Sequence, residues 1–476
     1  MLRCEAIRDK GHRMTSRLFL CVALFTLSPG LAHAQPGAVA AIDEVVTRFA
    51  DSPQASQPFH DMLRGAVDTN PRLGQAVAQQ LEAKQAKREA KAALYPTLGV
   101  NVTSDRSLSR EFRDRTGNLI ESSRPRARTD ATVSGQQLLY DFGATANRIE
   151  GAKYRIDGAE AGAKQVATEV AVDAARAYFD VLRARAQVEM GRDFIARHEQ
   201  ILADVKLRQQ QGYGPAGDVA RVEGYLASAE GQIAGFDRQR AQAEARFLEV
   251  FGFAAPPDLT RPVAATGASR SRDEAVDTAT KNNAALSRID ALTKSAASDY
   301  RVTRSQRWPS IAFAVDASAF GITESGTDYD VRGRVVARYS VFEGGAATAR
   351  AAQAFQRLRQ AEANESQAQK EVERQASIAW EDMSVLERQA ETLRRSYEAN
   401  KRTRDLFVEQ FRVARGSLID VLQSEQDYFE AAVRYLDGLT ELDVARYTLL
   451  GATGELLDVI GVTLSFSSAK EVLGRE

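Results

Sequence analysis

The most constraining feature of this sequence is a long internal duplication. Residues of the first half recur in the second half at a constant offset of 202 positions, as in Glu169-Val170 with Glu371-Val372, Gly214 with Gly416, Asp218-Val219 with Asp420-Val421, and Glu223 with Glu425. Tyr95-Pro96 matches Trp308-Pro309 at an offset of 213, so an insertion separates the two copies. A repeat of this length is not a solenoid unit of about 20 to 50 residues. The sequence therefore predicts two structurally equivalent halves.

The N-terminus has the composition of a secretory signal peptide. Basic residues between Arg3 and Arg17 precede an apolar run from Leu18 to Leu27, and Ala32-His33-Ala34 follows. Such a basic region, short apolar region and A-x-A site are typical of a segment that is removed after export. We therefore predict a signal peptide over 1–34, in place of a membrane anchor or a buried helix. No lipid anchor is expected, because Cys21 is not preceded by the small residue of a lipoprotein signal.

Charge and residue usage argue against several classes of function. The 476 residues carry a formal net charge of −1, which gives no electrostatic reason to expect a nucleic-acid partner. Removal of 1–34 would take away Cys4 and Cys21 and leave only His60 and His198 as histidines. A thiolate zinc site and a Cys–His nucleophile pair both need residues that would then be missing. We therefore expect no enzyme, no cofactor and no metal site.

Composition and proline positions organise the first half. Residues 35–58 are rich in Ala, Pro, Ser and Gln and are predicted to be flexible. A helical pattern begins near Phe59, turns at Asn70-Pro71 and ends before Tyr95-Pro96, because proline lacks a backbone donor and disfavours helix at the preceding residue. An alternation of apolar and polar residues over about 97–140 then predicts a β-hairpin.

The second hairpin has the clearer pattern. Apolar residues alternate with polar ones from Ile311 to Ala319 and again from Gly333 to Val341, and Arg332, Arg334 and Arg338 share the polar face. This alternation over about ten residues is typical of transmembrane barrel strands, although a half-buried hairpin of a soluble protein is the alternative. No other stretch reaches the roughly 18 to 20 apolar residues of a transmembrane helix. A membrane location would therefore require a β-barrel.

A helix of unusual length follows each hairpin. No proline or glycine occurs from Ala346 to Val413, which predicts about 100 Å of helix at 1.5 Å per residue. Its seam alternates spacings of four and three residues, and the same seam recurs 202 positions earlier, where His198 matches Asn400 as an expected register-setting polar contact. The seam of the second copy is Val372, Ala376, Ala379, Met383, Leu386, Ala390, Leu393, Tyr397, Asn400, Arg404, Phe407 and Phe411. Turns at 212–215 and 415–417 then lead into returning helices that end near Phe251 and Leu450.

These boundaries give the predicted organisation of the chain. The segments are a signal peptide (1–34), a flexible segment (35–58), a first repeat (59–252) with its hairpin at about 97–140, a linker (253–273), a second repeat (274–460) with its hairpin at about 310–342, and a C-terminal tail (461–476). In each repeat, a helix before the hairpin and the returning helix together match the length of the long helix.

Four strands in one chain cannot close a barrel, and lipid does not tolerate an open sheet edge. Three chains would supply 12 strands, the smallest cyclic closure that leaves a lumen. If the strands are transmembrane, the residues thus predict a membrane pore with a helical conduit, and the family resemblance given below implies the full fold class, an α+β membrane protein. Two β-hairpins of each chain contribute to a trimeric 12-stranded outer-membrane β-barrel, and a long antiparallel α-helical coiled coil forms a periplasmic tunnel.

Ordered motifs in both halves give the chain a family resemblance. They are Asn70-Pro71, Leu94-Tyr95-Pro96-Thr97-Leu98, Leu139-Tyr140-Asp141-Phe142-Gly143 with its echo Val341-Phe342-Glu343-Gly344-Gly345, and Gly416-Ser417-Leu418-Ile419-Asp420-Val421-Leu422. From about Phe59 to Leu457 the chain resembles the TolC family of outer-membrane efflux and secretion proteins. The resemblance implies a homotrimer in the outer membrane of a Gram-negative bacterium. Its partners would be a periplasmic adaptor (membrane fusion) protein, an inner-membrane ABC-type exporter or other pump, outer-membrane lipid, and an exported protein or small-molecule cargo.

The same resemblance places a channel aperture at the two helical turns. It implies aperture roles for Asp420, Asp218, Arg415, Phe411 and Tyr213. Asp420 would belong to an acidic ring, whereas Gln423 stands where some members of the family have a second Asp. Placement of Asp218 and Asp420 in the first turn of a helix is also favourable by itself, by about 0.3–1 kcal/mol. Arg332, Arg334 and Arg338 would line the barrel lumen and make it locally cationic.

Three functions are compatible with these features. The first is the exit duct of a type I protein secretion system, favoured by the missing lipid anchor and by the resemblance of the C-terminal helix pair to that of secretion members of the family. The second is the outer-membrane component of a multidrug or small-molecule efflux pump. The third is a soluble periplasmic coiled-coil scaffold or adaptor, whose hairpins would only cap the helices.

Overall fold

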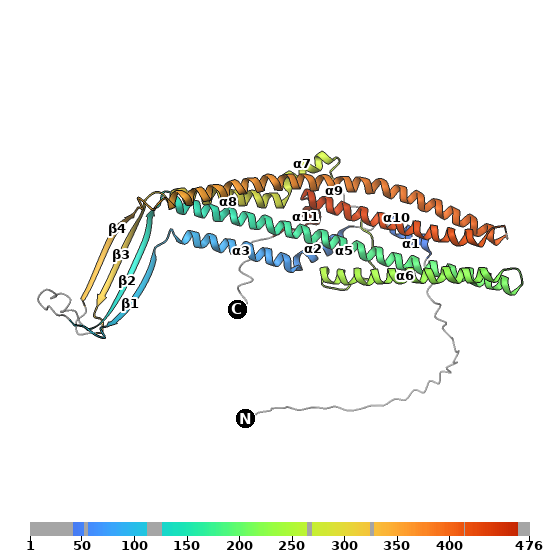
Figure 1. Cartoon of the computed structure of the whole chain (residues 1–476), viewed down its shortest axis with the longest axis horizontal. Helices are drawn as coiled ribbons and strands as arrows, with labels where there is room; N and C mark the ends of the chain where they lie inside the picture. Colours follow the sequence, from blue (N-terminus) through green and yellow to red (C-terminus); the bar gives the residue numbers. More distant parts are fainter. Residues whose placement is uncertain are drawn as a thin grey trace, which may run out of the picture. The chain divides into compact units, whose positions relative to one another are not determined.

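The computed structural model describes residues 41–51, 56–111, 126–263, 269–323, 328–413 and 415–464. The predicted signal peptide, most of the predicted C-terminal tail and much of the connection within the first hairpin lie outside these ranges. Figure 1 shows long helices that are followed, at the end where α5 and α9 begin, by a single sheet. The helices are α1 (Ile42–Asp51), α2 (Gln57–Thr69), α3 (Pro71–Ala92), α5 (Ala144–Gln210), α6 (Ala216–Phe251), α7 (Arg272–Asn282), α8 (Ala284–Ser305), α9 (Ala346–Arg412), α10 (Leu418–Thr453) and α11 (Leu456–Val459). The strands are β1 (Thr97–Arg106), β2 (Ala127–Tyr140), β3 (Ser310–Phe320) and β4 (Asp328–Arg338).

The duplication is visible in the lengths of the helices. Both α5 and α9 have 67 residues, both α6 and α10 have 36, and both α3 and α8 have 22. One expectation is corrected, because the helix predicted over about 274–306 is broken at Asn283 into α7 and α8. The side chain of Asn283 accepts a hydrogen bond from the Ala285 amide at 2.9 Å, as Asn70 does from the Arg72 amide in the first repeat. An Asn N-cap therefore ends one helix and starts the next in both halves.

Two shorter helices lie along each long helix, as predicted. In Figure 1, α3 and α6 follow one another along α5, while α8 and α10 follow one another along α9. Helix α5 also contacts α8 and α10, so it joins the two repeats. Among the helices within the described ranges, none combines the length and the apolar character needed to cross a membrane.

The predicted seam is confirmed by burial. Six of the seven buried residues of α9 are seam positions, and in α5 the corresponding residues from Val170 to Val188 are buried as well. The polar contact expected across the seam is not formed. His198 Nδ1 instead lies 2.9 Å from the carbonyl oxygen of Phe194, and Asn400 donates to the carbonyl of Ser396 at 2.9 Å, each within its own helix. A backbone carbonyl one turn earlier is the nearest acceptor for both side chains.

Glycine allows close approach of the paired helices at complementary positions. A Cβ atom on Gly191 of α5 would lie 2.6 Å from Ile233 of α6, and one on Gly438 of α10 would lie 2.6 Å from Leu393 of α9. Gly191 and Leu393 are equivalent positions, 202 residues apart. At this level of the helix pair, the large residue therefore lies on the returning helix in the first repeat and on the long helix in the second.

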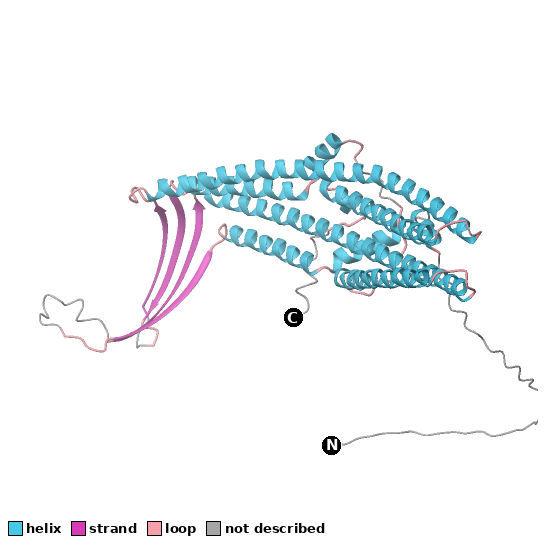
Figure 2. Cartoon of the chain, turned by 45° about the vertical axis from the view of Figure 1, so that its right-hand side comes forward, coloured by secondary structure: helices cyan, strands magenta, loops and turns pink. Residues whose placement is uncertain are grey.

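The sheet has the strand order β1-β2-β3-β4 with antiparallel pairs throughout, so β2 and β3 join the two hairpins (Figure 2). The strand register aligns Val100 with Val133, Val133 with Ala317, and Ala317 with Val331 across all four strands. The residues of this apolar face are Leu98, Val100, Val102, Ala131, Val133, Phe313, Val315, Ala317, Val331 and Val335. The opposite, polar face carries Thr97, Asn101, Thr103, Thr132, Ser134, Gln136, Asp316, Ser318, Arg332 and Arg334. The alternation predicted from the sequence is thus continuous from one edge strand to the other.

The segment predicted to be flexible, 35–58, contains a helix. Helix α1 buries Ile42, Val45, Val46 and Phe49 against α5 and α10. The prediction of a flexible segment is therefore wrong over 42–51, because these four side chains contribute apolar area to the main core. Residues 35–40 and 52–55 lie outside the described ranges.

The end of α10 is a site where a small substitution has a large expected effect. Gly454 has a φ of +82°, and a Cβ atom there would lie 2.6 Å from the carbonyl oxygen of Asn282, at the break between α7 and α8. We expect Gly454→Ala to lower the free energy of unfolding by about 2–4 kcal/mol. The cost of a left-handed backbone at alanine adds to the cost of the overpacked contact. Thermal unfolding of the purified protein in detergent measures the loss.

A second glycine provides a control for the general effect of a glycine-to-alanine substitution on stability. Gly231 lies within α6, and no neighbouring atom lies within 4 Å of the position that a Cβ atom would take there. Gly231→Ala should therefore stabilise the protein by up to about 1 kcal/mol, because alanine favours the helix. Equal unfolding temperatures for Gly454→Ala and the wild type would contradict the close approach at Asn282.

Candidate functional site

The two turns that end the long helices have the same backbone geometry. The Tyr213 amide donates to the carbonyl of Arg208 at 2.9 Å, and the Arg415 amide donates to the carbonyl of Gln410 at 2.9 Å, 202 residues later. Gly416 has to be small here, because a Cβ atom would lie 3.0 Å from the Phe411 amide nitrogen. Helix α10 then starts with Ser417 as N-cap, whose hydroxyl accepts from the Ile419 amide at 3.2 Å.

An apolar cluster packs the two turns against each other. Val205 of α5 and Val222 of α6 are buried together with Leu418 and Leu422 of α10, and Phe411 packs on the same cluster. Above this cluster, the guanidinium of Arg208 lies 4.1 Å from the centre of the Phe411 ring. Arg208 therefore links the end of α5 to the end of α9, a contact that the sequence analysis missed because no motif marks it.

The structure places the five predicted aperture residues around this cluster, and each of them is exposed or half-buried. Tyr213 is 85% exposed, Arg415 and Asp420 are exposed, and Asp218 is half-buried in the first turn of α6. Within the described part of the chain, no ion pair engages Arg415, Asp218 or Asp420. Phe411 differs from the others, because its ring packs against the cluster and Arg208. The charged groups at the turns are thus available to a second chain.

The three arginines predicted to line a lumen all lie on β4 at the polar face. Arg334 pairs with Asp316 at 2.7 Å, and Arg332 pairs with Asp330. Arg338 has no ion pair among the described residues. Two of the three charges are therefore compensated, and the expected local positive charge is concentrated at Arg338, next to the helices.

A half-buried polar cluster between α1, α9 and α10 was not predicted. Asp43 accepts hydrogen bonds from the hydroxyls of Tyr397 at 2.5 Å and Tyr428 at 2.6 Å, and it pairs with Lys401 at 2.8 Å. We call these four residues the Asp43 cluster. Burial alone would raise the pKa of Asp43, but the hydrogen bonds from Lys401, Tyr397 and Tyr428 outweigh it and hold this pKa below its ordinary value. The cluster joins the two helices of the second repeat to the N-terminal helix.

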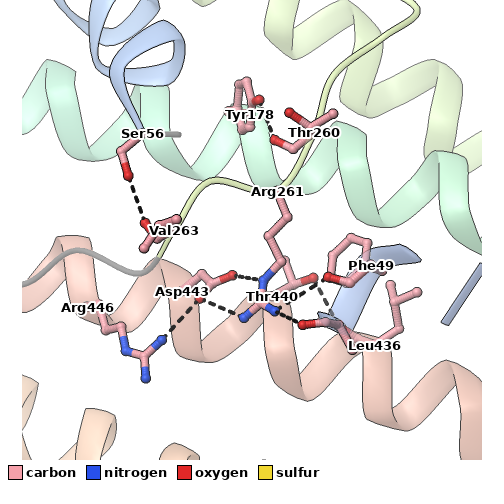
Figure 3. A network of polar contacts seen from close by, with 11 residues as sticks. Phe49, Ser56, Tyr178, Thr260, Arg261, Val263, Leu436, Thr440, Asp443 and Arg446 are labelled. Atoms are coloured by element: carbon pink, nitrogen blue, oxygen red, sulfur yellow. Dashed lines mark hydrogen bonds and ion pairs between the residues drawn. The ribbon is translucent and has the colours of Figure 1, made fainter. Parts of the chain in front are cut away.

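The linker between the repeats is also fastened to the helices (Figure 3). Arg261 makes two hydrogen bonds to the carboxylate of Asp443 in α10, at 2.6 and 3.1 Å, and Arg446 reaches the same carboxylate at 3.4 Å. The hydroxyl of Tyr178 in α5 donates to the carbonyl of Thr260 at 2.7 Å. Since Asp443 is buried, the charge-assisted pair fixes Arg261 to α10, and the hydrogen bond from Tyr178 fixes Thr260 to α5.

Asp437 of α10 gives the helical part a defined pH dependence. Burial raises the pKa of Asp437 to about 6, although Arg183 lies 4.0 Å away and Gln187 donates to it at 2.7 Å. Because the folded chain then binds the proton more tightly than the unfolded chain, stability falls as the pH rises from about 4 to about 6. Asp437→Asn should remove this fall and raise stability by about 1–2 kcal/mol at pH 7.5, with little change at pH 4.

Chemical denaturation at pH 4 and pH 7.5 measures this difference. Asp427→Asn provides the control, because Asp427 is exposed on the same helix and should leave the pH dependence as it is. A gain for Asp437→Asn of the same size at both pH values would show that titration of Asp437 is not its cause.

Within the described residues, no three His, Cys, Asp or Glu side chains are grouped so that they could hold a metal ion. The features that remain are a two-faced sheet, a set of very long helices and two charged turns at the far ends of these helices.

Comparison with known proteins agrees with this arrangement. Residues 62–252 match the family model described as outer membrane efflux protein. The chain is 25% identical over 349 residues to the outer membrane efflux protein BepC of Brucella suis biovar 1 (strain 1330), which covers 71% of this chain and 75% of BepC. Its fold is similar to that of CusC, with a TM-score of 0.74, 17% identity and coverage of 84% of this chain and 92% of CusC. It is also similar to the outer membrane protein VceC of Vibrio cholerae, with a TM-score of 0.70, 15% identity and coverage of 83% and 96%.

Proposed function

Because the chain belongs to the TolC family of outer membrane efflux proteins, we propose that it is the outer-membrane exit duct of a tripartite export system. In this proposal it acts as a homotrimer in the outer membrane of a Gram-negative bacterium. A periplasmic adaptor protein and an inner-membrane pump supply the cargo and the energy.

The observation that carries the proposal is the sheet at the end of the long helices. Its apolar face is exposed, with Val100 and Val335 at 73% and 67% of their full area, while its opposite face is polar. Each edge strand, β1 or β4, pairs with only one other strand of the described part of the chain. Pairing of β1 with β4 of a neighbouring copy would satisfy both edges, and three copies would close 12 strands with the polar face inward. The 67-residue helices would then continue the duct by about 100 Å into the periplasm.

Type I protein secretion is the finer form of this proposal. It is supported by the resemblance of the C-terminal helix pair to that of secretion members of the family. Small-molecule efflux is the second candidate, and the name of BepC, an efflux protein, favours it. Loss of a secreted protein from the medium of a deletion strain, with unchanged resistance to toxic compounds, is expected for secretion. The opposite pair of results would support efflux.

Single-channel recording in planar lipid bilayers tests the duct and its aperture together. If the turns form the closed end, the wild type should give small discrete pores, and Asp420→Ala should give larger ones because an acidic contact between copies is lost. Asp427→Ala, on an exposed position two turns along α10, should behave as the wild type. Pores of unchanged size in Asp420→Ala would keep the duct and remove Asp420 from the aperture. A wild type that forms no pores and stays in solution without detergent would favour the periplasmic scaffold instead.

A further inference from the structure

A pocket of about 840 Å³ lies where the sheet meets the helices. Its walls come from the helix-proximal ends of all four strands, the end of α8 and the first turns of α5 and α9. The strand residues in the wall include Thr97, Gln136, Ser310 and Arg338, which belong to the polar face of the sheet. The pocket therefore opens on the polar face. We call it the neck pocket.

The charges in the wall of the neck pocket are unbalanced. It contains four arginines, Arg148, Arg307, Arg338 and Arg350, and two carboxylates, Asp141 and Glu343. Both carboxylates are already engaged within the chain. Glu343 pairs with Arg350, and Asp141 accepts from the backbone amides of Gly143 at 3.2 Å and Thr145 at 2.7 Å, which caps α5.

The other three arginines, Arg148, Arg307 and Arg338, are exposed and have no ion pair to any described residue. They come from α5, from the turn after α8 and from β4, so the fold itself brings them together from three separate parts of the sequence. Arginine presents planar donors that match the oxygens of a carboxylate or phosphate, and such charge-assisted bonds are stronger than neutral ones. Beside them, Trp308 stacks on Phe142 at 5.5 Å between ring centres and gives the pocket an apolar wall.

We propose that the neck pocket is a binding site for organic anions, which Arg148, Arg307 and Arg338 hold through their carboxylate groups as these solutes pass from the helical part into the sheet. The inference rests on the proposed function for the direction of passage, but the site itself does not depend on a pore. In a trimer, three such pockets would surround the same axis and make the duct selective for anions at this level. The paired arginines of the sheet, Arg332 and Arg334, contribute less, because Asp330 and Asp316 compensate them.

Citrate is a suitable probe because it carries three carboxylates. Isothermal titration of citrate into the full-length protein in detergent, at low ionic strength, should give saturable binding. The combined variant Arg148→Gln, Arg307→Gln and Arg338→Gln should bind at least about tenfold more weakly, since each lost charge-assisted contact is worth a factor of this order. Arg238→Gln, an exposed arginine on α6 without an ion pair to described residues, should bind as the wild type. Absent binding to the wild type, or equal binding to the combined variant, would overturn the site.

Single variants keep the test decisive if the combined variant does not fold. Arg148→Gln and Arg307→Gln each remove one exposed charge and should each weaken citrate binding, and unchanged binding in both would also overturn the site.

Reversal potentials in a KCl gradient test the role of the neck pocket in the duct. Chloride selectivity in the wild type should fall in the combined variant and persist in Arg238→Gln. Citrate binding that depends on the arginines, in a protein that forms no pores, would retain the site and reject the duct. A protein that forms pores but does not bind citrate would retain the duct and reject the site.

Discussion

Val100→Arg should prevent assembly in the outer membrane, whereas Asn101→Arg should leave it nearly unchanged. The two residues are neighbours on β1, but Val100 pairs with Val133 on the apolar face and Asn101 pairs with Thr132 on the polar face. Arginine on a lipid-facing barrel position costs about 2–4 kcal/mol at the middle of the bilayer and much less in a lumen. Since each trimer would carry three copies, the cost for Val100→Arg is on the order of 6–12 kcal/mol.

Membrane fractionation and the trimer band on unheated gels measure this effect. Val331→Arg on β4 is a second test of the apolar face at the other edge of the sheet, where Val331 aligns with Ala317. Both apolar-face variants should be lost from the outer membrane fraction, and Asn101→Arg should be retained as a trimer. If Val100→Arg and Asn101→Arg reached the membrane in equal amounts, the apolar face would not be the lipid-facing one.

Periodicity is the reason why much of this fold can be predicted from the sequence. The offset of 202 residues transfers each feature of one repeat to the other, and the helix lengths and turn geometry follow it. The alternation at two-residue spacing assigns the faces of the strands before any pairing is known. The order of the strands cannot be obtained in this way, because the pairing of β2 with β3 depends on contacts between the two halves.

The missed elements carry weaker local signals. Helix α1 has apolar residues at 42, 45, 46 and 49, a helical spacing that was present in the sequence but is short and lies among Ala, Pro and Gln residues. The break at Asn283 has no proline after it, so only its equivalence to Asn70 marks it.

The polar contacts of the candidate sites could not be predicted from the sequence for a different reason. Alternation placed Arg334 on the polar face, but its ion pair with Asp316 runs diagonally between the strands, because the register sets Asp316 opposite Arg332. The three arginines proposed to bind anions in the neck pocket come together only in the fold, since they lie far apart in the sequence.

Asp43→Asn should destabilise the helical part and release α1. The amide cannot pair with Lys401 as a carboxylate does, and the hydroxyls of Tyr397 and Tyr428 lose a charged acceptor. Hydrogen bonds to a charged group contribute more than neutral ones, so we expect a loss of about 2–4 kcal/mol in the free energy of unfolding at pH 7. The lowered pKa of Asp43 means that its contribution is present above the ordinary pKa of 3.8 and disappears as the pH falls through the lower folded value. The variant should therefore differ most from the wild type at neutral pH and least in strong acid.

Glu44→Gln is the matched control, because Glu44 follows in the same helix, is exposed and makes no ion pair to the described residues. Thermal unfolding in detergent should separate Asp43→Asn from Glu44→Gln, and limited proteolysis should cut near α1 only in the former. The Asp43 cluster lies far from the turn between α9 and α10. Tyr397 precedes the end of α9 by 15 residues, or about 22 Å of helix. At this distance from the turn, the hydrogen bonds of Asp43 to Tyr397 and Tyr428 hold α9 and α10 together. Loss of these hydrogen bonds should therefore loosen the helix pair that carries Asp420. Equal protease resistance of both variants would limit the Asp43 cluster to a local contact without influence on that pair.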